Sequence, residues 1–234
     1  MKRSRSFFSV FAILLILNIL SSCSKSPYIK RSYLSKTATP KGIYHTIEKG
    51  QTLWRICKAY GVDMQEVAEI NDITDSSQIW VGQRIFIPGA KKVLKIKPFK
   101  GEWGPEKKIV KSKGRFFWPV KGKVTSRYGI RKGRKHDGID IAAPVGTIVM
   151  AGDSGKVIYS GRLRGYGKIL ILRHRGSYVT VYAHLKDWLV RKDRRVKRGE
   201  AIARVGISGR TSGGHLHFEI RYRDRTRNPL FYLK

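Results

Sequence analysis

The sequence predicts a mainly β protein with two domains, a small βααβ unit and a C-terminal antiparallel β-sheet domain, joined by flexible linkers. Residues 44–88 carry two short helical periods of apolar residues between two apolar strands. Residues 116–234 consist of short β-type runs separated by glycine turns, with no helix period beyond a turn or two. Residues 23–43 and 89–115 are rich in Lys, with Ser, Thr, Pro or Gly and no hydrophobic period, which is typical of linkers.

Residues 1–22 have the pattern of an export signal. Three basic residues near the N-terminus precede an apolar run from Phe7 to Leu20. This run suits the apolar region of a signal peptide and is short for a membrane-spanning helix. The segment that ends at Cys23 resembles a bacterial lipobox, which implies that Cys23 is lipidated and becomes the new N-terminus. The alternative is an ordinary signal peptide followed by an incidental cysteine.

The lipobox resemblance implies a place in the cell envelope. Similar lipoproteins carry two or three acyl chains, which makes their membrane anchoring stable. Ser24 rather than Asp follows the cysteine, and in lipoproteins of two-membrane bacteria this favours the outer membrane, facing the periplasm. Residues 23–43 would then form a tether. After lipidation Cys57 is the only free cysteine, and we expect it to pack as a small buried hydrophobe.

Residues 44–88 predict a compact unit of two strands and two helices. Thr52 is a candidate N-cap for the first helix, and Gly61 is placed to end it. Asp63 with Glu66 three residues later marks the start of the second helix. The expected elements are a strand at Tyr44–Ile47, a helix at Leu53–Tyr60, a second helix from Asp63 to about Ile70, and a strand at Arg84–Ile87.

This unit resembles a LysM domain, a peptidoglycan- and chitin-binding module. The matching runs are Gly50-Gln51-Thr52-Leu53-Trp54, Tyr60-Gly61-Val62, Asn71 and Val81-Gly82-Gln83-Arg84-Ile85-Phe86-Ile87-Pro88. The resemblance implies a shallow carbohydrate groove formed by Gly50, Gln51, Thr52, Asn71 and Ile73. Gln51 stands where the family usually has an acidic residue. The alternative is that these residues only cap helices and form turns.

Two runs in the β domain alternate polar and apolar residues, as strands do when successive side chains face opposite ways. In the first run, His136 and Asp140 share a face with Gly138 between them. In the second, His215 and His217 share a face that continues through Glu219 and Arg221. Nitrogen and oxygen ligands of this kind, with one position left open, are typical of a catalytic zinc site.

From Phe116 onward the chain resembles the lysostaphin/LytM-type zinc endopeptidases of peptidase family M23, which cut peptide bonds in bacterial peptidoglycan. The matching runs are Thr125-Ser126-Arg127-Tyr128-Gly129-Ile130-Arg131, His136-Asp137-Gly138-Ile139-Asp140, Tyr182-Ala183-His184-Leu185, His215-Leu216-His217-Phe218-Glu219 and Asn228-Pro229. The resemblance implies that His136, Asp140 and His217 hold one Zn²⁺ per chain and that His184 and His215 act in catalysis. Either of these two histidines can be the general base.

The resemblance leaves two further functions open. Some relatives have lost zinc ligands and act as activators of murein amidases, whereas all five site residues are present here. A purely structural wall-binding lipoprotein is the third possibility. Tyr182 is a candidate hydrogen-bond partner for the site, with core packing as the alternative. His174 lies at an expected hairpin turn without a convergent partner, and we leave it outside the site.

The charge of the chain is uneven. Residues 44–88 hold four Lys/Arg and six Asp/Glu, a net charge of −2, whereas residues 116–234 hold 27 and eight, a net charge of +19. Such a surface attracts polyanions in a salt-dependent way. Nucleic acid is excluded as a partner by the export signal and by the lack of a base-stacking or base-reading motif. Peptidoglycan is the expected partner, and anionic envelope polymers, anionic lipid headgroups or solvent alone remain open for the basic surface.

Overall fold

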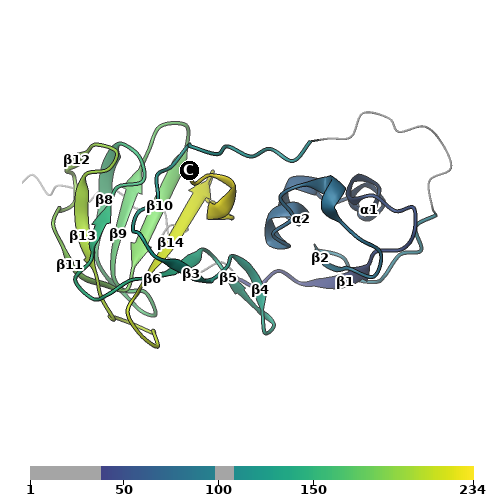
Figure 1. Ribbon diagram of the computed structural model, residues 1–234, viewed down its shortest axis with the longest axis horizontal. Coiled ribbons are helices and arrows are strands. Elements are labelled where there is room, and N and C mark those ends of the chain that lie inside the picture. Colours follow the sequence, from purple (N-terminus) through teal and green to yellow (C-terminus); the bar gives the residue numbers. More distant parts are fainter. Residues whose placement is uncertain (1–37, 98–107) are drawn as a thin grey trace, which may run out of the picture.

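The computed structural model describes residues 38–97 and 108–234. The expected signal segment, Cys23, most of the tether and the middle of the basic linker lie outside the described residues. Two bodies lie side by side along the long axis, a small domain with two helices and a larger β domain (Figure 1). In the part of the chain that the structure describes, no helix is long and apolar enough to cross a membrane.

The N-terminal domain has the expected βααβ order. Thr52 caps the first helix, and Gly61 ends it in the left-handed conformation with a φ of 65°. Asp63 caps the second helix by accepting a hydrogen bond from the backbone of Glu66 at 2.9 Å. Its elements are β1 (Gly42–Thr46), α1 (Leu53–Tyr60), α2 (Met64–Ile70), a 3₁₀ turn (Ser76–Gln78) and β2 (Arg84–Pro88), with β1 and β2 antiparallel.

Part of the segment expected to be a linker packs against this domain. Ile96 is buried in the same apolar cluster as Leu53 and Ile85. The side-chain amide of Gln51 donates a hydrogen bond to the carbonyl oxygen of Ile96 at 3.1 Å. Ile109 packs against the cores of both domains. These contacts bring both described ends of the linker onto the folded bodies.

The β domain is built on one large antiparallel sheet with the order β12-β8-β9-β10-β14-β6-β3, and β15 also pairs with β14. A three-stranded sheet, β11-β13-β7, and the hairpin β4-β5 complete the domain. The strands are β3 (Lys123–Ser126), β4 (Gly129–Arg131), β5 (Arg134–His136), β6 (Ile139–Ala142), β7 (Ile148–Met150), β8 (Gly155–Leu163), β9 (Gly167–Arg173), β10 (Tyr178–Ala183), β11 (Leu185–Trp188), β12 (Arg195–Val196), β13 (Ala201–Val205), β14 (His215–Tyr222) and β15 (Arg225–Arg227). The mainly β fold expected from the sequence is therefore confirmed.

The large sheet is buried on both faces. On one face, Leu216, Phe218 and Ile220 of β14 join the main apolar core. The opposite face of the same strand carries His217, Glu219 and Arg221, which are also buried. Buried charges in such a position require partners inside the protein. The alternating side chains of β14 therefore separate an apolar core from a buried polar network. Both faces of the strand are shielded from solvent at its centre.

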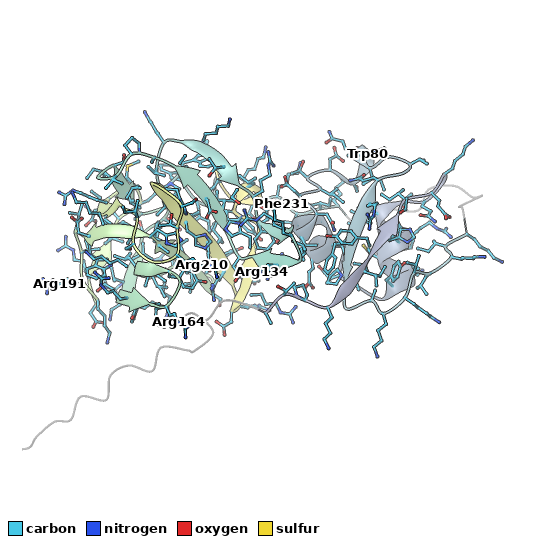
Figure 2. The ribbon with its side chains drawn as sticks, turned by 90° about the horizontal axis from the view of Figure 1, so that it is seen from below. Trp80, Arg134, Arg164, Arg191, Arg210 and Phe231 are labelled. Atoms are coloured by element: carbon cyan, nitrogen blue, oxygen red, sulfur yellow. The ribbon has the colours of Figure 1, made fainter. Side chains whose placement is uncertain are left out.

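The two domains are joined by a polar interface centred on Glu69 of α2, which is 2% exposed. Its carboxylate accepts hydrogen bonds from Arg227 at 2.8 Å and from the backbone of Asn228 at 3.2 Å. Asp72, just after α2, pairs with Arg127 and accepts a hydrogen bond from Asn228. Figure 2 shows the neighbouring Phe231 on the side of the β domain that faces the N-terminal domain.

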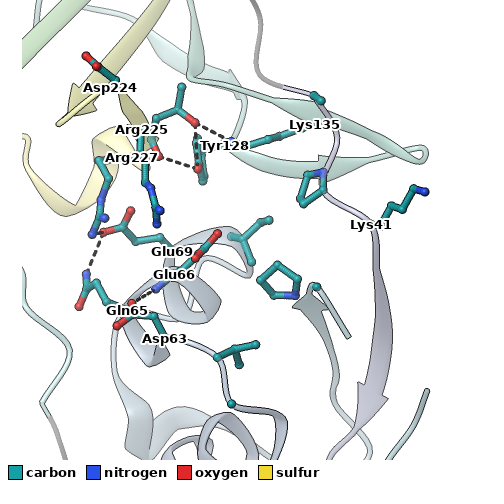
Figure 3. Close-up of a pocket in the computed structure, with 18 residues that line it drawn as sticks. Lys41, Asp63, Gln65, Glu66, Glu69, Tyr128, Lys135, Asp224, Arg225 and Arg227 are labelled. Atoms are coloured by element: carbon teal, nitrogen blue, oxygen red, sulfur yellow. Dashed lines mark hydrogen bonds and ion pairs between the residues drawn. The ribbon is translucent and has the colours of Figure 1, made fainter. Parts of the chain in front are cut away.

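A cavity of about 940 Å³ lies beside this interface. Figure 3 shows Glu69 and Gln65 of α2 on one wall and Arg225 and Arg227 of β15 on the other. The close approach depends on Gly129, because a Cβ there would lie 2.4 Å from the carbonyl oxygen of Ile70. The domains therefore meet through matched charge and backbone contact more than through apolar packing.

Replacing Glu69 by alanine is expected to separate the domains. The substitution leaves the Arg227 guanidinium without its carboxylate and costs about 1–3 kcal/mol, as expected for a buried charged group that loses its partner. The measurement is small-angle X-ray scattering together with thermal unfolding of the full chain. Glu66→Ala, on the exposed side of the same helix, is the control. Equal scattering and stability in the two variants would contradict this role of Glu69.

Candidate metal centre

Two paired strands and the end of a third bring the expected ligands together. His217 of β14 lies directly opposite Asp140 of β6. His136 ends β5, and the chain reaches β6 through Asp137 and Gly138. A Cβ at Gly138 would lie 2.2 Å from the carbonyl oxygen of Phe218. The glycine therefore lets this connection pass close to β14 and places His136 beside the Asp140–His217 pair.

Three donor atoms converge at this point. His217 Nδ1 lies 2.8 Å from Asp140 Oδ1, and His136 Nε2 lies 3.1 Å from that oxygen and 3.2 Å from His217 Nδ1. One ligand atom from each residue lies within 4.8 Å of the other two. Two imidazole nitrogens and one carboxylate oxygen fit the donor set of a zinc site with an open position. The residues present therefore fit zinc.

A buried network fixes His217 from behind. Its Nε2 donates to Glu219 Oε1 at 3.0 Å, and Glu219 accepts further hydrogen bonds from Tyr166 Oη at 2.7 Å and Arg221 Nε at 2.7 Å. His136 is held in the same manner, since its Nδ1 donates to the carbonyl oxygen of Arg127 at 2.8 Å. Histidines that bind metal ions almost always donate their second N–H to such an acceptor.

The local electrostatics favour positive charge at the point where the ligands meet. Burial alone would raise the pKa of Asp140, but hydrogen bonds from His136 and His217 hold it well below its usual range. Burial would lower the pKa of His217, yet hydrogen bonds to Asp140 and Glu219 raise it to about 9. Although burial opposes it, Arg221 and His217 lower the pKa of Glu219 to about 2. Two carboxylates are thus ionised around one imidazole.

Both expected catalytic histidines lie beside the ligands. His184 follows β10, and its ring centre lies 4.9 Å from that of His215 and 5.9 Å from that of His217. Its Nδ1 donates to the carbonyl oxygen of Ser208 at 2.8 Å, and burial lowers the pKa of His184 to about 4. His215 places Nε2 3.9 Å from Asp140 Oδ1 and donates from Nδ1 to the carbonyl oxygen of Gly213 at 3.0 Å.

Comparison with known proteins shows the family. Residues 134–229 match the family model of peptidase family M23, and residues 45–88 match that of the LysM domain. The chain is 36% identical to lipoprotein YgeR of Escherichia coli, covering 92% of this chain and 88% of that protein. The chain belongs to peptidase family M23.

Three further similar proteins match about half of the chain. The M23 half is 45% identical to the murein hydrolase activator NlpD of Escherichia coli over 117 residues, which cover 50% of this chain and 30% of NlpD. A zinc-containing peptidase from Vibrio cholerae is 35% identical over 52% of this chain and 40% of its own, with a TM-score of 0.46. The catalytic domain of lysostaphin from Staphylococcus simulans is 28% identical over 47% of this chain and 90% of its own, with a TM-score of 0.42.

The expected groove residues of the LysM domain take part in internal bonds. Gln51 is 8% exposed, and its side-chain oxygen accepts from His45 at 2.9 Å. Thr52 caps α1, and Ile73 is buried in the core. The side chain of Asn71 bonds the backbone of Phe86 on both sides, at 2.7 and 2.9 Å. Their role in binding carbohydrate, like that of Gly50 in the turn before α1, stays a prediction.

Sequence analysis did not identify Tyr166, and for Tyr182 it left two roles open, a hydrogen-bond partner for the site and core packing. Tyr182 is fully buried and bonds Gly152 and Thr180 in the core, so its alternative, core packing, describes it. Tyr166 instead reaches Glu219 from the turn before β9. The only sequence signal for the network was the shared face of His217, Glu219 and Arg221. His174 bonds Ser154 and Thr180 and contacts Phe116, in keeping with its place outside the site.

Proposed function

We propose that the chain is a cell-wall hydrolase, a zinc-dependent endopeptidase that cleaves peptide bonds in the stem peptides or cross-bridges of peptidoglycan. The observation that carries the proposal is the convergence of His136, Asp140 and His217 within 4.8 Å, with His184 and His215 beside them. A binding protein has no need of three ligands and two further histidines at one point. Membership of peptidase family M23 supports the same activity.

When bound, zinc supplies a Lewis acid that polarises a carbonyl group and lowers the pKa of a water molecule. The residues of the chain supply the remaining functions. The carbonyl oxygens of Ser208 and Gly213 accept hydrogen bonds from Nδ1 of His184 and His215. Thr211 Oγ1 also lies 3.1 Å from Nδ1 of His215 but donates its proton to the carbonyl oxygen of Gly213, so Nδ1 carries the proton in both rings. Nε2 of each ring is then the atom placed to accept a proton during hydrolysis. Glu219 and the carbonyl oxygen of Arg127 orient the ligand imidazoles.

Hydrolysis of isolated peptidoglycan sacculi by the purified chain tests the proposal. We expect zinc-dependent release of peptide fragments that stops with a chelator and is absent in His217→Ala, because that variant loses a central ligand. Mass spectrometry of the fragments identifies the cleaved bond. His174→Gln, far from the site, is the control for a buried histidine. Release that survives both the chelator and His217→Ala would contradict the proposal.

The proposed function includes two anchors outside the M23 domain, namely Cys23 and the LysM domain. We propose that lipidated Cys23 anchors the chain to a membrane, the outer one in a two-membrane envelope, and that the LysM domain holds it to the glycan. Relatives named lipoproteins support the anchor. Tethering raises the effective concentration of the enzyme at the wall without any new catalytic contact.

A second function has one specific observation in its favour. The M23 half is 45% identical to NlpD, which is named a murein hydrolase activator, and 37% identical to DipM of Caulobacter vibrioides, named a cell division protein. In this alternative the chain stimulates a murein amidase without cutting peptides itself. Sacculi incubated with the chain and an amidase distinguish the two. Release that needs the amidase and is unchanged by His217→Ala supports the activator.

A further inference from the structure

A basic cavity adjoins the metal centre. It has a volume of about 610 Å³, and its lining combines the ligand His136 with Arg131, Lys132, Arg134 and Lys135 of the β4–β5 hairpin. Lys135 pairs with the buried Asp137. The side chains of the other three basic residues are exposed. The cavity therefore places several cations on the hairpin that ends at the expected ligand His136.

The hairpin geometry sets these cations close together. Lys132 and Gly133 form the two-residue turn, both with positive φ, 45° and 70°. Arg131 then lies directly opposite Arg134 in the register of β4 and β5. Like charges that face each other across two strands destabilise a sheet. In the part of the chain that the structure describes, none of these three residues forms an ion pair that would offset this repulsion.

Two more exposed arginines lie on loops that contact the catalytic histidines. Arg164 precedes the turn whose residue Tyr166 accepts a hydrogen bond from the backbone of His184 at 2.9 Å. The backbone of Arg210 donates to Gly165 in the same turn at 3.0 Å, which ties the two loops together. Figure 2 shows Arg210 between Arg134 and Arg164 in that view, with Arg191 at the far end of the β domain.

Most carboxylates of the M23 domain pair with groups outside the hairpin and the two loops. Asp137 and Glu219 are buried in internal pairs. Four exposed or half-buried ones pair with other bases, namely Asp153 with Arg198, Asp187 with Arg204, Asp193 with Lys156 and Glu200 with Arg194, and Asp140 belongs to the candidate metal centre. None of the ion pairs in the described part of the chain involves Arg131, Lys132, Arg134, Arg164 or Arg210, here called the basic rim, so these side chains can pair with a ligand.

We propose that the basic rim selects peptides that carry free carboxylates, so that the substrate is an acidic stem peptide and not a neutral bridge or an amidated stem. The inference rests on the proposed function for its substrate and adds the charge that the substrate must bear. Guanidinium groups bind carboxylates through paired hydrogen bonds, which gives geometric selectivity as well as attraction. The hairpin part of the rim lines a cavity with His136, and the loops of Arg164 and Arg210 contact each other and His184. A ligand charge that meets the rim therefore belongs to the peptide itself and not to a distant phosphate polymer.

The test is binding of two matched peptides to the full chain with a chelator present, so that no cleavage occurs. One peptide is a stem tetrapeptide with free side-chain and terminal carboxylates, and the other is its fully amidated form. Fluorescence anisotropy gives both dissociation constants. We expect the amidated peptide to bind about tenfold more weakly or worse, as for the loss of several exposed charge pairs. We also expect increasing salt to weaken binding of the free acid only.

The rim variant carries Arg131→Gln, Lys132→Gln and Arg134→Gln. It should lose most of the preference for the free acid and keep or gain thermal stability, since the facing arginines are removed. The control variant carries Arg175→Gln, Arg191→Gln and Arg195→Gln, three exposed arginines outside the rim. This control should keep the preference, although it removes the same number of charges.

Three results would overturn the inference. They are equal affinity for the two peptides, equal losses in the rim and control variants, and a soluble polyphosphate that displaces the free acid equally well from both variants. Failure of the proposed function can be told apart from failure of this inference. The first is an absence of sacculus hydrolysis with zinc, whereas the binding assay reports the preference of the rim whether or not the chain is an active hydrolase.

Discussion

Glu219→Ala is expected to destabilise the M23 domain by about 3–5 kcal/mol, the usual cost of removing one partner from a buried ion pair. Glu219 and Arg221 are both 0% exposed, and they contact each other at 2.6 Å. Alanine leaves the Arg221 guanidinium buried without its carboxylate and removes the acceptor of Tyr166 and His217. Denaturant unfolding of the full chain, followed by tryptophan fluorescence, measures the loss.

A second variant separates folding from metal binding. Glu219→Leu with Arg221→Met replaces both charges by apolar groups of similar size, and such replacements recover much of the lost stability. His217 still lacks its acceptor in this double variant, so we expect zinc affinity to fall about 10–100-fold, as when such hydrogen-bond partners of metal ligands are removed. Asp193→Ala, which breaks an exposed pair with Lys156, is the control and should cost less than about 1 kcal/mol.

Two outcomes would contradict these roles of Glu219. A double variant that folds and binds zinc as tightly as the wild type would show that Glu219 serves packing and not the metal site. A Glu219→Ala variant as stable as Asp193→Ala would show that the other partners of Arg221, Tyr166 among them, compensate for the lost carboxylate.

The sequence could predict the shared strand faces behind the cluster of His136, Asp140 and His217 because strand periodicity is local. His217 and Glu219 alternate with Leu216 and Phe218, so one short run specifies which side chains share a face. The same run forms the strand β14, His215–Tyr222, in the structure. What it could not predict is burial of the polar face, because this depends on Tyr166 and the neighbouring strands, which lie far away in the sequence.

The short elements and the domain contact were beyond local patterns. The hairpin of β4 and β5 has strands of three residues each, too short for periodicity to stand out. The docking of Glu69 against Arg227 and Asn228 joins residues more than 150 positions apart. On the sequence, Glu69 resembles any polar helix residue. Ile96 likewise lay in a segment whose composition indicated a linker, yet its side chain is buried.

His184→Asn is expected to lower peptidoglycan hydrolysis by about 10²–10⁴-fold, the range for loss of a proton-transferring side chain, while zinc binding is retained. His184 is outside the three-residue ligand cluster, and its Nδ1 already donates to Ser208. Asparagine is chosen because His184 has a φ of 61°, a left-handed conformation that asparagine tolerates better than most residues. Elemental analysis and the rate of fragment release are measured on the same sample.

The backbone control is Ser177→Asn, since Ser177 has a matching φ of 62° in an exposed turn and should leave the rate unchanged. His217→Ala is the opposite reference, because it should lose zinc and activity together. If His184→Asn also loses zinc, His184 belongs to the metal-holding structure. If His184→Asn keeps both zinc and the full rate, His215 is the proton-transferring residue. Its Nε2 lies 3.9 Å from Asp140 Oδ1. Zinc retained with hydrolysis lost is the result that assigns His184 to proton transfer, because the tautomer fixed by Ser208 leaves Nε2 as its only free acceptor.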